Sequence, residues 1–273
     1  MRNFKDITIV NVDGSGSGQN AVYAIEETLK QLPGAKALLI SADLPNYLPY
    51  PISWMPCNPM GYYEYSIFML YCLHTYIHTD FALIVQDDGW ALNGNNWRDE
   101  WYGYDYIGAP CHAALVPNGD GTGEIVLNYQ WEGNPDAVIL QNGGFSLRSH
   151  RFLKAPSYHG IIYQMHDHPL LKNEDVQLNF LLRNQLEARG LIFAPTESAV
   201  YFSAEYLGIK THENVDLTKV FGHHSQNRRI RGPKTILYQT TEREMEKLHG
   251  EPEMMDLLEN YYKYEVSYVH SNA

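Results

Sequence analysis

The sequence predicts an α/β fold with a mostly parallel central sheet. Two apolar segments, residues 7–12 and 37–41, flank a helical pattern over about residues 20–31. A third apolar segment, residues 81–85, follows a second helical pattern over residues 62–78. Strand–helix–strand connections within one sheet are right-handed and leave their strands parallel, so this order predicts a parallel sheet that helices cover.

The remaining elements follow a less regular pattern. Residues 43–61 contain five prolines and no clear period, so we expect a long loop there. Short apolar strands are expected at residues 105–108 and 137–140, and a helix over about residues 172–189. These elements would extend the sheet and add a helix to one of its faces.

The chain is expected to consist of one large domain and a small appendage. From about Thr241 the sequence becomes charged and rich in Met and Tyr, and Pro252 interrupts it, which predicts two short helices. We therefore expect an α/β domain over residues 1–240 and a C-terminal helical appendage over residues 241–273 packed on it. A chain of 273 residues with 44% hydrophobic content can bury a sizeable core.

Composition restricts the partners and the compartment. The formal net charge of -12 and the pI near 5.4 argue against non-specific binding to nucleic acid or to anionic membranes, which needs a cationic surface. Three widely spaced cysteines fit neither a disulfide framework nor a thiolate metal site. The N-terminus has no signal-peptide pattern and no apolar run is long enough to span a membrane, so a cytoplasmic location is expected.

The most informative segment is the end of the third predicted strand. The apolar residues 81–85 are followed directly by Gln86, Asp87 and Asp88. Open α/β sheets bind ligands just beyond the carboxyl ends of their strands. Carboxylates at that position predict a site for a divalent cation with a phosphate group attached.

A glycine-rich loop lies between the first predicted strand and the first predicted helix. This loop, residues 13–18, could cradle a phosphate, and we assign Asp13 and Gly14 to such a contact. Its spacing differs from the dinucleotide pattern G-x-G-x-x-G, and it lacks the Gly-Lys-Ser/Thr of a P-loop. Taken alone, the loop therefore does not identify a nucleotide site.

Three further segments each allow two interpretations. The paired Gly143 and Gly144 indicate either a backbone that a ligand approaches closely or a plain turn between strands. Glu174 and Asp175 stand where a helix begins, and the helix dipole alone favours acidic residues there. The basic segment 228–234 is either a solvated loop or a cationic lid over a diphosphate.

Five short motifs occur in one order over roughly residues 60–225. They are Gln86-Asp87-Asp88, Asp105-Tyr-Ile-Gly-Ala-Pro110, Asn142-Gly-Gly-Phe-Ser-Leu-Arg148, Glu174-Asp175-Val176 and Phe221-Gly-His-His224. This order resembles GT-A glycosyltransferases, and most closely a glycosyltransferase-like family with bacterial and viral members and no assigned function. The resemblance implies a GT-A-like catalytic domain with a Rossmann-type sheet.

A looser resemblance is to metal-dependent inverting β-1,3-type glycosyltransferases, and it implies a metal site. Asp88 and His224 would bind the metal, with His223 as the adjacent alternative. Gln86 stands where many relatives have the first Asp of Asp-x-Asp, so cation affinity would depend on Asp88 and on the donor diphosphate. The implied cofactor is a divalent cation, Mn²⁺ or Mg²⁺.

The same resemblance implies the catalytic base and the acceptor site. Asp175 is the expected base, with Glu174 second, and Asn142, Gly143 and Gly144 would line the acceptor site. Because Asp175 lies near a helix start, we expect its pKa to be lowered, which would leave it ionised but weakly basic. Residues expected to contact the donor are Asp13, Gly14, Gln86, Asp87, Arg228 and Arg231.

The predicted activity is metal-dependent, inverting transfer of a sugar from a nucleotide-sugar donor to a hydroxyl-bearing acceptor of unknown class. The net charge disfavours nucleic acid as that acceptor. Two alternatives fit the same residues. One is a metal-dependent phosphoesterase or nucleotidyltransferase, and the other is a glycan-binding protein without catalysis.

Overall fold

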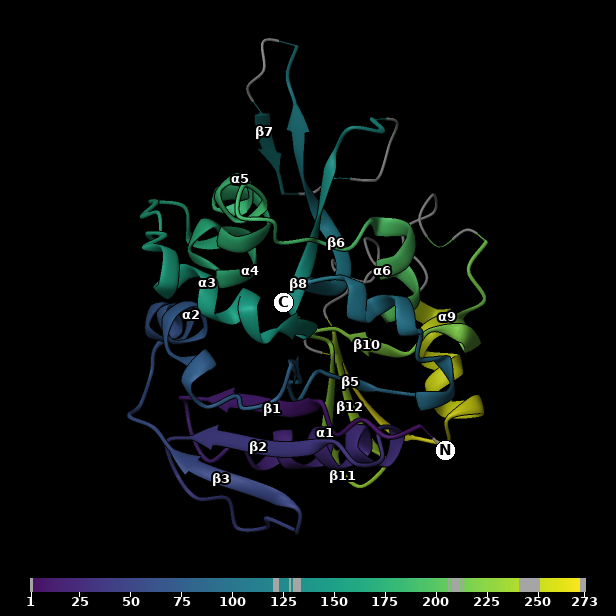
Figure 1. Ribbon diagram of the computed structural model, residues 1–273. Helices are drawn as coiled ribbons and strands as arrows, with labels where there is room; N and C mark the ends of the chain where they lie inside the picture. Colours follow the sequence, from purple (N-terminus) through teal and green to yellow (C-terminus); the bar gives the residue numbers. More distant parts are fainter. Residues whose placement is uncertain are drawn as a thin grey trace.

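The chain folds around a mixed β-sheet with helices packed on it (Figure 1). The structure, a computed structural model, describes residues 2–119, 123–127, 129, 134–205, 207, 212, 214–240 and 251–270. Within these residues the central sheet has seven strands in the order β3-β2-β1-β4-β8-β6-β7. Their bounds are β1 (Ile7–Asp13), β2 (Lys36–Ser41), β3 (Ile52–Pro56), β4 (Phe81–Ile84), β6 (Tyr106–Pro117), β7 (Gly123–Val126) and β8 (Val138–Ser149).

Strand direction in this sheet changes at the boundary between β4 and β8. β1 pairs in parallel with β2 and β4, and β2 pairs in parallel with β3. β8 is antiparallel to β4 and β6, and β6 is antiparallel to β7. The predicted α/β fold with a mostly parallel sheet is confirmed, since only β7 and β8 point against the other strands.

One strand lies where the sequence led us to expect a loop. β3 falls within residues 43–61 and pairs along its length with β2. The prolines of this segment are compatible with pairing because β3 is an edge strand, where one row of backbone groups needs no partner. The expectation of an uninterrupted loop was therefore wrong.

Helices cover both faces of the parallel half of the sheet. Ile7 and Ile9 of β1 pack in the same core cluster as Val22 of α1 (Gln19–Gln31). Val10 points to the opposite face and shares a cluster with Met69 of α2 (Tyr62–Tyr71). This alternation along one buried strand is what a parallel strand with two covered faces requires.

The remaining helices include one that is interrupted. They are α3 (His150–His159), α4 (Glu174–Val176), α5 (Arg183–Glu187), α6 (Thr196–Phe202) and α9 (Glu251–Asp256). A π-helical turn, Gln177–Leu181, joins α4 to α5 where one helix was expected over residues 172–189. Short 3₁₀ turns lie at Leu73–Thr75, Gly94–Asn96, Asp99–Gly103, Pro169–Lys172 and Leu217–Lys219, and a second π-helical turn lies at Leu257–Tyr261.

Two small sheets adjoin the central one. The first has the order β5-β10-β9, with β5 (Gly89–Ala91), β9 (Ser203–Ala204) and β10 (Gly222–His224). The second has the order β11-β12-β13, with β11 (Arg228–Gly232), β12 (Thr235–Thr240) and β13 (Glu265–His270). None of the helices in the described ranges combines the length and apolar character that crossing a membrane requires.

The C-terminal segment differs from the helical appendage that the sequence predicted. β13 pairs in parallel with β12 over its whole length, so this segment contributes a strand as well as α9. The β-branched and aromatic alternation of residues 265–269 explains the strand. The sheet thus crosses the expected boundary at residue 240, and residues 241–250 lie outside the described residues.

We predict that a single hydrogen bond helps to fix this segment on the body. The indole Nε1 of the fully buried Trp90 donates to the Tyr264 hydroxyl over 2.7 Å. Tyr264→Phe leaves that N–H buried without a partner, so the free energy of unfolding in urea should fall by about 1–3 kcal/mol. Tyr261→Phe is the control, because Tyr261 is 55% exposed, and it should change stability little. Equal effects of the two substitutions would contradict the prediction.

Candidate active site

The end of β4 opens a pocket at the carboxyl edge of the parallel strands. A tight turn follows the strand, in which the amides and carbonyls of Gln86 and Gly89 exchange two hydrogen bonds of 3.1 Å. Asp87 and Asp88 occupy the corners of this turn and line a pocket of about 610 Å³. The other lining residues are Asn11, Val12, Asp13, Ser15, Ser17, Gly18, Gln19, Asn20, Ala21, Tyr62, Tyr65, Gln86 and Arg229.

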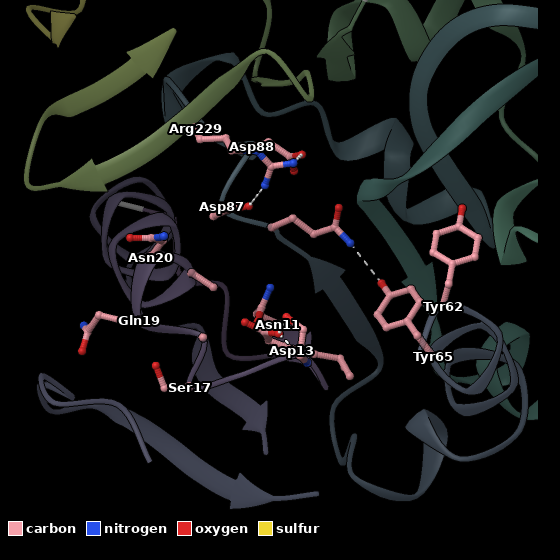
Figure 2. Close-up of a pocket in the computed structure, with 15 residues that line it drawn as sticks. Asn11, Asp13, Ser17, Gln19, Asn20, Tyr62, Tyr65, Asp87, Asp88 and Arg229 are labelled. Atoms are coloured by element: carbon pink, nitrogen blue, oxygen red, sulfur yellow. Dashed lines mark hydrogen bonds and ion pairs between the residues drawn. The ribbon is translucent and has the colours of Figure 1, made fainter. Parts of the chain in front are cut away.

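Two helices form opposite walls of this pocket. Figure 2 shows Tyr62 and Tyr65 projecting from α2 on one side and Gln19 and Asn20 at the start of α1 on the other. α1 begins after Gly18, whose φ of 63° is the left-handed region that glycine adopts without strain. Gln19, Asn20 and Ala21, the first residues of this helix, line the pocket, so the helix N-terminus lies at its wall, an arrangement that favours an anion such as phosphate.

The glycine-rich loop contributes to the pocket unevenly. Asp13 lines it and accepts hydrogen bonds from the Ser15 amide and hydroxyl at 2.9 and 2.6 Å. Gly14 is packed elsewhere, since a Cβ on it would lie 2.4 Å from the Cβ of Met60. The structure thus brings Asp13 into the expected donor region and leaves Gly14 as a packing position.

Three buried side chains form a row behind the turn. Nε2 of His224 lies 3.3 Å from Oδ1 of Asp88, and Nδ1 of the same ring lies 3.6 Å from Oε1 of Glu205. All three residues are buried. Burial opposes a charged imidazole, but the two flanking carboxylates outweigh it and raise the pKa of His224 to about 10.

The carboxylates of this turn respond differently to burial. Burial alone would raise the pKa of Asp88, but His224 and Arg229 hold it below the ordinary value. For Asp87, burial and the neighbouring Asp88 raise the pKa, and Arg229 and Arg231 only partly offset them. Asp88 is therefore the carboxylate that stays ionised over the wider pH range.

The basic segment that follows His224 begins as the strand β11, so the interpretation as a solvated loop was wrong for residues 228–232. Its alternation sends Arg229 and Arg231 to one face, where they lie 2.6 and 3.8 Å from the Asp87 carboxylate. Arg228 points to the other face and is fully buried. The residue that lines the pocket is thus Arg229, and Arg228 lies outside it.

His223 and His224 point to opposite sides of β10. The ring of the fully buried His223 packs edge-on against Trp90 at a centroid distance of 4.1 Å. Burial, with Arg228 nearby, lowers the pKa of His223 well below the ordinary value, so this ring is neutral. Of the two candidates from the sequence, the structure places His224 beside Asp88.

The Gly143–Gly144 segment is a bulge in β8, within the strand. Gly108 and Ala109 are consecutive in β6, yet their partners Ser146 and Asn142 are four residues apart, so residues 143–145 bulge out. A Cβ on Gly144 would lie 2.3 Å from Nε2 of His224 and 2.5 Å from Oε1 of Gln86. The bulge therefore brings bare backbone against the row of charged residues, which explains why position 144 is glycine.

The polar groups around the bulge are tied to one another. The Gly144 amide donates to Oδ1 of Asn142 over 2.6 Å, and Nδ2 of Asn142 donates to Oε1 of Glu205 over 3.4 Å. Nε2 of Gln86 donates to the Tyr65 hydroxyl over 3.1 Å. Asn142 and Gln86 thus have fixed orientations on either side of the bulge.

On its other side, the bulge contacts the expected catalytic acids. The Gly143 amide donates to Oδ2 of Asp175 over 3.1 Å, and the Val176 amide donates to Oδ1 of Asp175 over 2.8 Å. The buried Glu174 pairs with Arg148 through contacts of 2.8 and 3.3 Å. Glu174 is therefore neutralised by an internal ion pair, whereas Asp175 forms no ion pair with a cationic side chain in the described part of the chain.

The pKa of Asp175 departs from the sequence expectation. Burial, together with the adjacent Glu174, raises it from 3.8 to about 7, although the two amides oppose the shift. The expected lowering by a helix start was wrong because the carboxyl is removed from water. A carboxylate with a pKa near 7 is a stronger base than the one we expected.

Several pocket and cluster residues were not found from the sequence. Glu205, Arg229, Tyr62 and Tyr65 were not assigned a role. Glu205 follows a two-residue strand, which has no recognisable period. Arg229 had a usable signal, because alternation within residues 228–232 separates the buried from the pocket-facing arginines.

The described residues supply some of the ligand atoms that a divalent cation needs. Oδ1 of Asp88 and both ring nitrogens of His224 are buried without a hydrogen-bond partner, which is the state of ligand atoms that a cation would complete. Among the described residues, no group of three or more His, Cys, Asp or Glu side chains is arranged to hold a metal ion. The fit is thus to a cation bound by two protein ligands and completed by substrate oxygens.

The sequence matches the family described as "Protein of unknown function (DUF5672)" over residues 62–224, and the chain belongs to this family. No curated protein matches the chain. Among solved structures, the chain is similar to a complex of the galactosyltransferase LgtC with donor and acceptor sugar analogs, at 12% identity and a TM-score of 0.44, covering 81% of this chain and 87% of that one. An active-site mutant of LgtC is similar at 13% identity and a TM-score of 0.44, with the same coverage of both chains.

We predict that Gly144 tolerates no side chain. In Gly144→Ala the methyl group would force His224 and Gln86 apart, so we expect a loss of about 1–3 kcal/mol in unfolding free energy and weaker binding of Mn²⁺. Gly103→Ala is the matched control, since a Cβ at Gly103 meets nothing within 4 Å. Chemical denaturation and calorimetric titration with Mn²⁺ measure the two effects. A Gly144→Ala protein as stable as the Gly103→Ala protein would exclude the close approach.

Proposed function

We propose that the protein is a glycosyltransferase that moves a sugar from a nucleotide-sugar donor to a hydroxyl group of an acceptor. The observation that carries the proposal is the position of the Gly143–Gly144 bulge. It lies between a phosphate-compatible pocket with an acidic floor and a buried carboxylate of raised pKa. With no side chain on these glycines, the donor sugar and the acceptor could meet here, with the diphosphate in the pocket and Asp175 on the acceptor side of the anomeric carbon.

The pocket supports the donor part of the proposal. Its volume of about 610 Å³ lies within the range of small-molecule sites. The start of α1 would face the diphosphate, Arg229 lines the pocket, and Arg231 lies near it, 3.8 Å from the Asp87 carboxylate. These arginines would exchange their contacts with Asp87 for phosphate oxygens when the donor binds.

Asp88 and His224 would hold the divalent cation, Mn²⁺ or Mg²⁺. When bound, the cation supplies positive charge that stabilises the departing diphosphate. His224 must give up its proton to serve as a ligand, so cation affinity should fall at low pH. Gln86, whose amide nitrogen is held by Tyr65, adds a neutral oxygen beside this site and no charge.

Asp175 would act as the base of an inverting transfer. The acceptor oxygen attacks the anomeric carbon, its bond to the diphosphate breaks, and the hydroxyl proton passes to Asp175. Glu174 is less suited to this role because its carboxylate is paired with Arg148. Retention of anomeric configuration, measured by NMR on the product, would remove Asp175 as the direct base.

The alternatives differ in what they require of these residues. A two-metal phosphoesterase or nucleotidyltransferase gathers several carboxylates around its ions, and the described residues hold no such group. A glycan-binding protein without catalysis has no use for a buried acid whose pKa lies near neutral pH. The first alternative would release a different product from the same donor, and the second would form no product.

We expect a cation-dependent rise in melting temperature with the correct nucleotide sugar. A donor at about 100 times its Kd adds about 2.7 kcal/mol to the stability of the folded protein, which corresponds to a shift on the order of 5 °C. A panel of nucleotide sugars with Mn²⁺ or Mg²⁺, read by thermal shift, tests this. Asp88→Asn should abolish the cation-dependent part, and a shift that chelation with EDTA leaves unchanged would contradict the metal site.

A further prediction concerns pH. Transfer requires ionised Asp175, whose pKa is about 7, so kcat/KM should fall as pH decreases through 7. With the divalent cation kept saturating at each pH, Asp175→Asn should lose at least about 100-fold in kcat and show no such decrease. Asp167→Asn, a change at an exposed acid, should keep the wild-type profile.

Stability provides an independent readout of the same group. Because its pKa is raised, Asp175 binds its proton more tightly in the folded protein than in the unfolded chain. This group therefore contributes its whole stabilisation of the folded state below pH 3.8, and the contribution is lost as pH rises through about 7. Asp175→Asn should remove that part of the pH dependence in equilibrium unfolding. A pH slope identical to wild type would show that Asp175 titrates normally.

A further inference from the structure

The small sheet β5-β10-β9 aligns three acidic and basic side chains by strand register. His224 of β10 pairs with Gly89 of β5, the residue directly after Asp88. On the other side, His223 pairs with Ala204 of the parallel strand β9, so the next position along places Glu205 beside His224. The imidazole therefore lies between two carboxylates, with Nε2 toward Asp88 and Nδ1 toward Glu205.

Arg228 and Asn142 hold Glu205 and His224 next to each other. A single nitrogen of Arg228, Nη2, donates to the backbone carbonyls of both residues, over 3.1 and 3.0 Å. Arg228 is fully buried, and its Nε lies 3.3 Å from Oε1 of Glu251. On the side-chain end, Asn142 contacts Oε1 of Glu205 and so ties it to the glycine bulge.

We propose that Glu205 is a positioning residue that orients the His224 ring so that Nε2 faces Asp88 and the bound cation. This inference rests on the proposed function, because it assumes that Asp88 and His224 hold the cation. Glu205 is buried, its Oε2 has no hydrogen-bond partner, and its Oε1 meets only the neutral Asn142 amide and the His224 ring, so within the described residues His224 is its one ion-pair partner. Carboxylates behind a ligating histidine fix its ring orientation and strengthen it as a ligand.

The test compares Mn²⁺ affinity across a set of variants, by calorimetry and, for weak binding, by water-proton relaxation. Glu205→Gln keeps the shape of the side chain and removes its charge, and we expect it to weaken Mn²⁺ binding about 10- to 100-fold. Glu197→Gln, a change at an exposed acid, should bind like wild type. Melting temperature for each variant verifies that the folded state is retained, and Asp88→Asn should abolish binding.

A double-substitution cycle separates positioning from direct ligation. If Glu205 acts through the ring, Glu205→Gln should cause no further loss in a His224→Gln background. A further loss there would mean that Glu205 itself contacts the cation and would overturn the inference. Unchanged Mn²⁺ affinity in Glu205→Gln, with binding lost in Asp88→Asn, would overturn the role of Glu205 alone. Absence of Asp88-dependent Mn²⁺ binding in wild type would overturn the metal site and this inference with it.

Discussion

The close approach of the Gly143–Gly144 backbone to two charged clusters is the constraint on which the site depends. β4 ends at Ile84, which pairs with Ser146 of β8. The bulge lies directly beyond this pair, where β8 no longer has β4 beside it. A side chain on either glycine would displace a charged group, since a Cβ on Gly143 would lie 2.4 Å from Glu174. The bulge thus sets the separation between the acid cluster around Asp175 and the row around His224.

Charge balance differs between these two clusters, and the difference suggests their roles. Glu174 is compensated by Arg148, and this pair leaves the neighbouring Asp175 with only amide donors, which is why burial can raise its pKa. In the other cluster, His224, Arg229 and Arg231 face Asp87, Asp88 and Glu205, so the charges balance only while the imidazole of His224 is protonated. A cation that replaced the imidazolium proton would keep this balance, which is why we propose this cluster as the metal site.

Elements with a local sequence pattern could be predicted from the sequence, whereas those that depend on pairing between short strands could not. The apolar run before Gln86 predicted a strand end, and Asp88 lies in the pocket there. Glu205 meets His224 only because strands of two and three residues pair, and such strands carry no period. The bulge at Gly143 depends on pairing with Gly108 of β6, and the raised pKa of Asp175 depends mainly on burial by tertiary packing, neither of which sequence spacing encodes.

The C-terminal segment is coupled to the site, which bears on where the functional unit ends. Arg228 joins the backbone of His224 and Glu205 to Glu251 of α9, and Tyr264 receives the hydrogen bond of Trp90, the residue paired with His223. An arginine buried to this degree needs its carboxylate, because burial of an unpaired guanidinium is strongly unfavourable. The residues after the expected boundary at 240 therefore help to hold the His224 strand in place, and a chain cut at that boundary would lose the counter-charge of Arg228.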